Sequence, residues 1–310
     1  MKTQAVTFAD LSASVLAVPP LARNADLTLN KTANGALIRH IEEGGISTLL
    51  YGGNANLYHI SVGEYGALLD QLAELAAPNT WVIPSVGPDF GKMMDQAELL
   101  RSRAFPTAMV LPATFPNTVA GAEAGLRRFA RAFGKPIIVY IKAEGYLTPQ
   151  AVKRLVDDGL VAGIKYAIVR ADPRQDAFLS ELVELVDRRT IISGIGERPA
   201  IVHLRDFGLN GFTTGSGCVG PRGSAGLLAA LKRKDYARAE ELRAAFIPLE
   251  DLRDAHSPIR VLHEAVRLAE IANTGPILPL LSNLDTEHHA AVKKAAQELL
   301  ATDRTLLQAR

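Results

Sequence analysis

Eight short apolar runs, rich in β-branched residues, alternate along this chain with stretches that have the spacing of amphipathic helices. In the helical stretch "PQAVKRLVDDG" (149–159), for example, apolar residues recur three or four positions apart. Such alternation is typical of parallel βα units. The sequence therefore predicts an α/β fold, a closed (β/α)8 TIM barrel, with strands within 14–19, 47–52, 81–86, 107–112, 136–141, 161–166, 190–195 and 211–216.

A doubly wound parallel sheet is the alternative fold. A dinucleotide-binding sheet of that kind carries the pattern Gly-x-Gly-x-x-Gly after its first strand, and no such pattern follows the run 14–19. The length of 310 residues suits one large barrel as well as two ordinary domains. The count of strand–helix units favours the barrel.

After the eighth run the sequence has only helical patterns, in 225–253, 258–272 and 286–303. A barrel needs one closing helix, so the surplus is predicted to form a C-terminal helical extension. No internal repeat or low-complexity linker divides the chain. We therefore expect a single domain, with the barrel core in 1–222 and the closing helix and extension in 223–310.

Composition narrows the class of partner. Lys and Arg total 34 against 33 Asp and Glu, so the net charge of +1 offers no basic surface for nucleic acid or anionic membranes. Asp10 interrupts the N-terminal apolar stretch, and no segment is long and apolar enough to span a membrane. One cysteine, Cys218, and seven histidines without metal-binding spacing argue against disulfides and a metal site. We expect a soluble cytoplasmic protein that handles small molecules.

A lysine interrupts the sixth apolar run, "GLVAGIKYAI" (159–168), where a buried ammonium is costly. Active sites of such barrels lie at the carboxyl ends of the strands, and both Lys165 and Tyr140 fall there on consecutive strands. An apolar barrel mouth lowers the pKa of a lysine and frees an amine that attacks carbonyls. The alternative is that Lys165 extends to water and Tyr140 is a core residue. Lys142 is a rival amine in a more polar loop.

The order of "PIIVY", "GIK", "ISGIGE" and "GLNGFTTGSGCVGP" resembles the dihydrodipicolinate synthase and N-acetylneuraminate lyase superfamily of class I aldolases, as an atypical member. The likeness runs from about residue 12 to about 300 and includes "LAVPPLARNADLTLN" and "TGPILPLLSNLDTE". In that family the strand-five tyrosine relays protons and the strand-six lysine forms the Schiff base. The resemblance implies these catalytic roles for Tyr140 and Lys165.

The loop after the second strand departs from the family. Where relatives have Gly-Thr-Thr-Gly-Glu to hold the substrate carboxylate, this chain has "GGNAN" (52–56), aligned through Glu64. Both hydroxyls are lost, yet the N–H groups of Gly53 and Asn54 and the Asn54 amide are still able to donate. We expect Gly52, Gly53 and Asn54 to bind substrate; the alternative is a simple glycine-rich turn.

Two residues of the synthases are also missing. Thr114 or Phe115 stands where synthases lend a tyrosine across a subunit contact, and Gly145 stands near the position of the arginine that binds their second substrate. These differences disfavour a lysine-pathway synthase. Further candidates for substrate contacts lie at strand ends and in loops: Gly194 and Thr213, and more weakly Ser193, Thr214, His59 and Glu144.

These observations predict a lyase that forms a Schiff base on Lys165 with a 2-oxo acid, either pyruvate or a 2-keto-3-deoxy sugar acid. The reaction is aldol cleavage or condensation, or dehydration, and the covalent Schiff base makes a cofactor or metal unnecessary. The alternatives are 4-hydroxy-tetrahydrodipicolinate synthase activity and a catalytically lapsed barrel that binds a ligand. From the resemblance we also expect a homo-oligomer, a tetramer or a dimer.

Overall fold

The computed structural model describes residues 1–308, in which eight parallel strands close into a barrel with β8 paired to β1. The predicted fold class is confirmed. Each strand lies inside its predicted run, although several are shorter than that run. The strands are β1 (Leu16–Ala17), β2 (Thr48–Tyr51), β3 (Trp81–Val86), β4 (Met109–Val110), β5 (Ile137–Ile141), β6 (Val161–Tyr166), β7 (Ile191–Ser193) and β8 (Gly211–Thr214).

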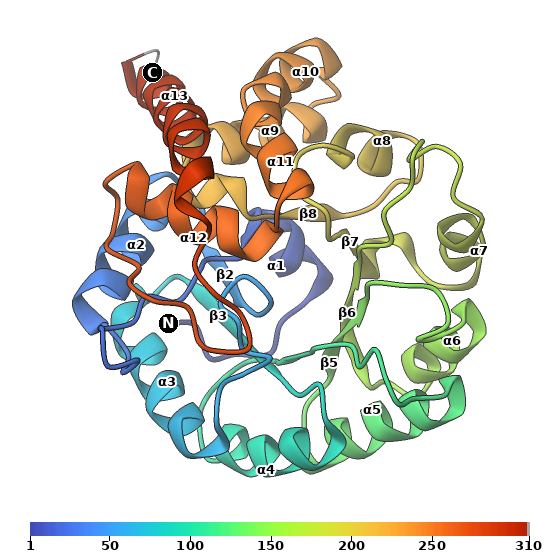
Figure 1. Cartoon of the computed structure of the whole chain (residues 1–310). Helices are drawn as coiled ribbons and strands as arrows, with labels where there is room; N and C mark the ends of the chain where they lie inside the picture. Colours follow the sequence, from blue (N-terminus) through green and yellow to red (C-terminus); the bar gives the residue numbers. More distant parts are fainter. Residues whose placement is uncertain (309–310) are drawn as a thin grey trace.

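Helices surround these strands (Figure 1), and α9 (Pro221–Lys232) closes the ring through its contacts with α8, α2 and β8. They begin and end where the sequence places caps: the Thr148 hydroxyl accepts the Ala151 N–H at the start of α6, and Gly134, with φ of 80°, ends α5. The other helices of the ring are α2 (Lys31–Glu43), α3 (Val62–Leu75), α4 (Phe90–Arg101), α5 (Val119–Phe133), α6 (Pro149–Asp157), α7 (Ala177–Leu185) and α8 (Ala200–Arg205).

A short N-terminal helix, α1 (Phe8–Ala13), was not predicted from the sequence. Its Leu11 packs onto β6, where a Cβ on Gly163 would lie 2.9 Å from Leu11 Cδ1. Its backbone also passes close to Gly211, the first residue of β8. Helix α1 therefore covers the amino ends of the strands, the end of the barrel away from the expected site.

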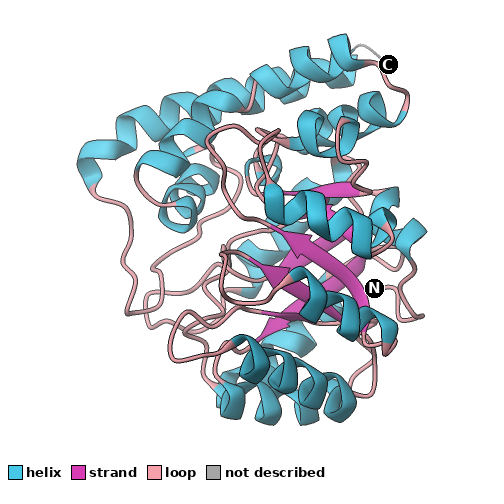
Figure 2. Cartoon of the chain, turned by 90° about the vertical axis from the view of Figure 1, so that its right-hand side faces the viewer, coloured by secondary structure: helices cyan, strands magenta, loops and turns pink. Residues whose placement is uncertain are grey.

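The C-terminal segment is helical as predicted, but its first stretch divides into three helices. Lys234, with φ of 60°, lies between α9 (Pro221–Lys232) and α10 (Tyr236–Ala244), and α11 (Ile247–Ala255) follows. The expected boundary at 222/223 falls inside α9. Two more helices, α12 (Pro258–Leu268) and α13 (His289–Gln308), complete the extension. Figure 2 shows α13 lying along the outside of the strands and their helices.

Within residues 1–308, none of the helices combines the length and the apolarity that a membrane crossing requires.

Candidate active site

Strand β6 directs Lys165 into the barrel mouth. Side chains alternate between the two faces of a strand, and the next residue, Tyr166, faces outward: its ring stacks on Phe178 of α7, with centroids 6.0 Å apart. Lys165 consequently points inward, where only 5% of its surface is exposed. The sequence-predicted lysine is thus a buried amine at the carboxyl end of its strand.

Tyr140 is the neighbour of Lys165 on the adjacent strand. The two residues are Cα partners in the register of β5 and β6. The Lys165 Nζ lies over the Tyr140 ring, 4.2 Å from its centroid. Equal register on parallel strands points both side chains to the same face, so the structure brings the predicted pair together.

Gly194 makes room for the lysine. A Cβ at this position would lie 2.8 Å from Lys165 Cγ and 2.9 Å from the Tyr166 carbonyl oxygen. Its N–H donates to that same oxygen at 2.6 Å. Only a residue without a side chain fits between β6 and the end of β7, so Gly194 shapes the path of the lysine.

Burial sets the protonation of both groups. Together with the smaller effects of the positive charges of Lys142 and Arg253, it lowers the pKa of Lys165 to about 7. Burial, with a smaller contribution from Tyr58, raises the pKa of the Tyr140 phenol above its ordinary value. At neutral pH the site therefore holds an amine that is neutral in a large fraction of molecules, beside a phenol that keeps its proton.

The "GGNAN" loop crosses the mouth on the side of β2. Gly53 and Asn54 line the same cavity as Lys165. In the described part of the chain their backbone N–H groups donate to no protein acceptor. The Asn54 side chain instead uses its amide to reach the Val18 carbonyl at 2.8 Å, and the Asn56 amide reaches the Leu278 carbonyl at 3.1 Å. The Asn54 and Asn56 side chains thus fix the loop to neighbouring segments, and the backbone N–H groups of Gly53 and Asn54 remain available to bind an anion.

Gly52 occupies a different place from the other two loop residues. A Cβ there would lie 2.9 Å from both Met109 Cε and Ser85 Oγ, so the residue packs into the barrel below the mouth. It is not one of the residues that line the cavity. Its close packing against β3 and β4 places the next residue, Gly53, at the rim of the cavity.

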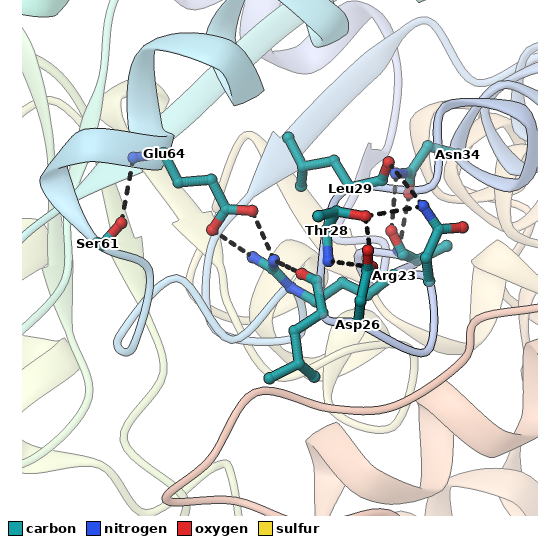
Figure 3. A network of polar contacts seen from close by, with 10 residues as sticks. Arg23, Asp26, Thr28, Leu29, Asn34, Ser61 and Glu64 are labelled. Carbon is teal, nitrogen blue, oxygen red and sulfur yellow. Dashed lines mark hydrogen bonds and ion pairs between the residues drawn. The ribbon is translucent and has the colours of Figure 1, made fainter.

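An ion pair fixes the segments on either side of this loop. Figure 3 shows the Glu64 carboxylate, at the start of α3, facing the Arg23 guanidinium in the loop after β1. The two side chains make paired hydrogen bonds of 2.6 and 3.0 Å. Arg23 is buried, and such a bidentate contact has little freedom. Glu64, used to align the loop with the family, therefore also anchors α3 to the strand-one loop.

At the ends of β7 and β8, one of two consecutive residues lines the cavity and the other faces away from it. Thr213 lines the cavity, as Gly194 does. Their neighbours face the helices: the Ser193 hydroxyl lies 2.8 Å from His203 Nδ1, and the Thr214 hydroxyl donates to Glu197 at 2.5 Å. Of these four candidates, Gly194 and Thr213 are positioned to contact a ligand.

The cavity around Lys165 has a volume of about 390 Å³. In the second loop its lining includes Tyr58, whereas His59, the candidate named from the sequence, is exposed outside it. Burial raises the pKa of Tyr58 to about 12. Lys142 lies at the rim and is exposed, and Glu144 is paired with Arg170 at 2.5 Å.

The C-terminal extension also lines this cavity, through Glu250 and Arg253 of α11. Glu250 is buried beside a second carboxyl, Glu197, whose N–H it accepts at 3.0 Å. Burial and the charge of Glu197 raise the pKa of Glu250 well above its ordinary value. Glu197 in turn accepts hydrogen bonds from the Thr214 and Ser224 hydroxyls.

Among residues 1–308, no three His, Cys, Asp or Glu side chains gather as metal ligands. Cys218 is fully buried, and burial raises the pKa of its thiol. A buried neutral thiol is a poor nucleophile. Cys218 is also not among the residues that line the cavity, whereas Lys165 is.

A closed (β/α)8 barrel with a cavity at the carboxyl ends of its strands is a scaffold on which many enzymes are built. The model of the Dihydrodipicolinate synthetase family matches residues 12–299, and the chain belongs to that family. No curated protein matches the sequence.

Solved structures of the same fold share little sequence with this chain. The dihydrodipicolinate synthase of Bacillus clausii is 21% identical, with a TM-score of 0.80 over 94% of this chain and 99% of that one. YagE, a prophage protein of E. coli K12 in complex with pyruvate, is 20% identical, with a TM-score of 0.82 over 92% and 98%. The sialic acid aldolase of Ruminococcus gnavus is 15% identical, with a TM-score of 0.81 over 95% and 99%.

Proposed function

We propose that this protein is a lyase that forms a Schiff base between Lys165 and a 2-oxo acid, pyruvate or a 2-keto-3-deoxy sugar acid. The observation that carries the proposal is the buried Lys165 amine, 4.2 Å from the centroid of the Tyr140 ring in a cavity of about 390 Å³. Membership of the family and the pyruvate complex of YagE support a 2-oxo acid as the substrate class.

In the proposed first step the neutral amine attacks C2 of the 2-oxo acid, and the carbinolamine loses water to give an iminium. Expulsion of hydroxide needs a proton, and the proposed donor is the Tyr140 phenol, whose pKa burial raises. The free N–H groups of Gly53 and Asn54 receive the C1 carboxylate. The covalent bond to Lys165 serves in place of a cofactor.

The iminium then accepts the electron pair of a breaking bond. In aldol cleavage the C3–C4 bond breaks, the C4 hydroxyl loses its proton, and an aldehyde leaves an enamine on Lys165. Condensation is the reverse reaction. In dehydration a proton leaves C3, the resulting enamine expels the C4 hydroxyl as water, and hydrolysis of the imine frees the lysine.

Trapping with borohydride tests the proposal. The protein is incubated with pyruvate and with longer 2-oxo acids, reduced, and weighed by mass spectrometry. We expect one reduced acid per chain in the wild type and in Lys153→Ala, which changes an exposed lysine paired with Asp157. We expect none in Lys165→Ala. Labelling that survives Lys165→Ala, or the absence of labelling with every acid, contradicts the proposal.

Measurements of substrate consumption and of ligand binding separate the alternatives. Consumption of pyruvate only together with aspartate 4-semialdehyde identifies the synthase activity, although no arginine occupies the loop position near Gly145. Binding of an acid without any reducible adduct identifies a catalytically lapsed barrel.

The proposal includes a homo-oligomer, a tetramer or a dimer. Two large apolar side chains are exposed. Phe90, the first residue of α4, is 50% exposed, and Phe115, in the loop before α5, is 88% exposed. Exposed aromatic residues are enriched where subunits meet. Sedimentation at micromolar concentration tests this part, and a monomer contradicts it.

A further inference from the structure

Arg253 enters the Lys165 cavity from outside the barrel. It lies on α11 in the C-terminal extension and lines the cavity, with 9% of its surface exposed. Its Nη1 lies 3.3 Å from the Ser216 hydroxyl, and its Nε lies 3.3 Å from the Pro258 carbonyl. A Cβ on Gly215 would be only 2.5 Å from Nη2, so this glycine lets the guanidinium rest on the end of β8.

The charge of Arg253 has no partner in the protein. Among residues 1–308 no carboxylate oxygen lies within 4.0 Å of it, and its Nη2 donates to no protein acceptor. Arg198, in the same cavity, is different: it is paired with Asp251 at 2.5 Å and Asp254 at 3.4 Å. An arginine is always charged, and burying it without an anion is unfavourable.

Glu250 does not neutralise this arginine, although it lies one turn earlier on α11. Its Oε1 accepts the Glu197 N–H at 3.0 Å, and none of its oxygens lies within 4.0 Å of the guanidinium nitrogens in the described residues. Burial and the neighbouring Glu197 raise the pKa of Glu250, which disfavours a negative charge on it. The cavity therefore contains a guanidinium without a carboxylate partner, and its Nη2 is free to donate to one.

The position of Arg253 differs from that of the C1 carboxylate. The Gly53 and Asn54 N–H groups follow β2, which lies opposite β6 in the closed order of eight strands. Arg253 rests on Gly215 after β8, two strands from β2 and two strands from β6. Two anion-binding positions thus lie in different directions around Lys165.

We propose that Arg253 binds a second carboxylate at the far end of the substrate, so that the enzyme acts on dicarboxylic 2-oxo acids. This inference rests on the proposed Schiff-base function. In this proposal, the C-terminal extension recognises the distal end of the substrate.

The test compares acids that differ only in the distal charge. 2-Oxoglutarate is paired with its neutral isostere 5-methyl-2-oxohexanoate, and 2-oxoadipate with 6-methyl-2-oxoheptanoate. Each is trapped with borohydride over a range of concentrations, with pyruvate as the reference. In the wild type we expect at least one dicarboxylate to reach half-saturation at a concentration about ten-fold lower than its isostere, as expected for a charged hydrogen bond.

Three variants assign the effect. In Arg253→Met, we expect a dicarboxylate and its neutral isostere to reach half-saturation at about the same concentration, because only the contact with the distal group distinguishes the two acids. This holds whatever the absolute rate of the variant. Arg243→Met, which changes an arginine of α10 paired with Glu240, keeps the wild-type ratio. Arg253→Gln retains a donor toward Ser216 and replaces Arg253→Met if that variant does not fold.

The outcomes distinguish the two proposals. If the wild type traps pyruvate but prefers no dicarboxylate over its isostere, or if the preference survives the loss of Arg253, the inference about Arg253 is wrong and the Schiff-base proposal stands. If no acid is trapped, pyruvate included, both proposals fail.

Discussion

Tyr140 and Lys165 face each other across the register of β5 and β6, with the lysine Nζ 4.2 Å from the centroid of the phenol ring. This relationship places a buried amine with a pKa of about 7 beside a buried phenol whose pKa is raised. The predictions below follow from it and from the groups that surround it.

Removal of the Tyr140 hydroxyl slows adduct formation. Tyr140→Phe keeps the ring beneath the Lys165 amine but removes the proton donor, so we expect the rate of borohydride-trapped adduct to fall about 100-fold. The matched control is Tyr146→Phe, which removes a buried phenol from outside the Lys165 cavity. Equal rates in the two variants would show that Tyr140 is not the relay.

The rate of adduct formation depends on pH through Lys165. Because burial lowers the pKa of this lysine to about 7, the rate rises as pH increases through about 7 and then levels off. The charge of Lys142 contributes to the low pKa, so Lys142→Gln moves the midpoint upward. A pH–rate profile measures both effects, and a midpoint near that of an exposed lysine contradicts the account.

Lys165 costs stability. Its pKa falls from 10.5 in the unfolded chain to about 7 in the folded one, so the unfolded state binds more protons between these values. The penalty is complete below pH 7 and disappears as pH approaches 10.5. Lys165→Met should therefore raise the free energy of unfolding at pH 7 by up to about 5 kcal/mol. Chemical denaturation at several pH values checks this.

The control for that experiment is Lys153→Met, which changes an exposed lysine. It should alter the free energy of unfolding by no more than about 0.5 kcal/mol. If Lys165→Met is no more stable than this control at pH 7, the amine does not carry the desolvation penalty on which its reactivity depends.

Glu250 gives a pH dependence of the opposite sign. Its pKa is raised in the folded state, so the folded protein binds more protons and loses stability as pH rises from about 4.5 toward the folded pKa. Glu250→Gln imitates the protonated carboxyl and removes this loss. Its stability relative to the wild type should increase with pH over that window, unlike that of Glu184→Gln on the surface of α7. A constant difference across the window argues that Glu250 is ionised.

Much of the fold could be predicted because each βα unit has a recognisable local sequence pattern. Each strand is an apolar run and each helix has its own periodicity, so the eight strands follow from the sequence. Helix α1 is six residues long, too short for a periodic pattern, although Thr7 and Asp10 form a capping box at its start. The break at Lys234 was missed because lysine rarely adopts a positive φ.

The residues of the site also differ in how far the sequence predicts them. Tyr140 and Lys165 were found because their positions at strand ends follow from the barrel itself. Arg253 and Glu250, three positions apart on α11, have the pattern of a solvated helix face. Their burial depends on how the extension packs over the barrel, a long-range contact without a local signal. Tyr58 was passed over for His59 because the sequence does not show which loop side chain turns inward.

The central claim is that Lys165, rather than another amine, forms the covalent bond with the substrate. Proteolysis of the borohydride-reduced pyruvate adduct, followed by fragmentation of the labelled peptide, locates the modified residue. We predict that the label lies on Lys165 alone, since Lys142 at the rim is exposed and solvated. A label on Lys142, or one spread over several surface lysines, would contradict the account.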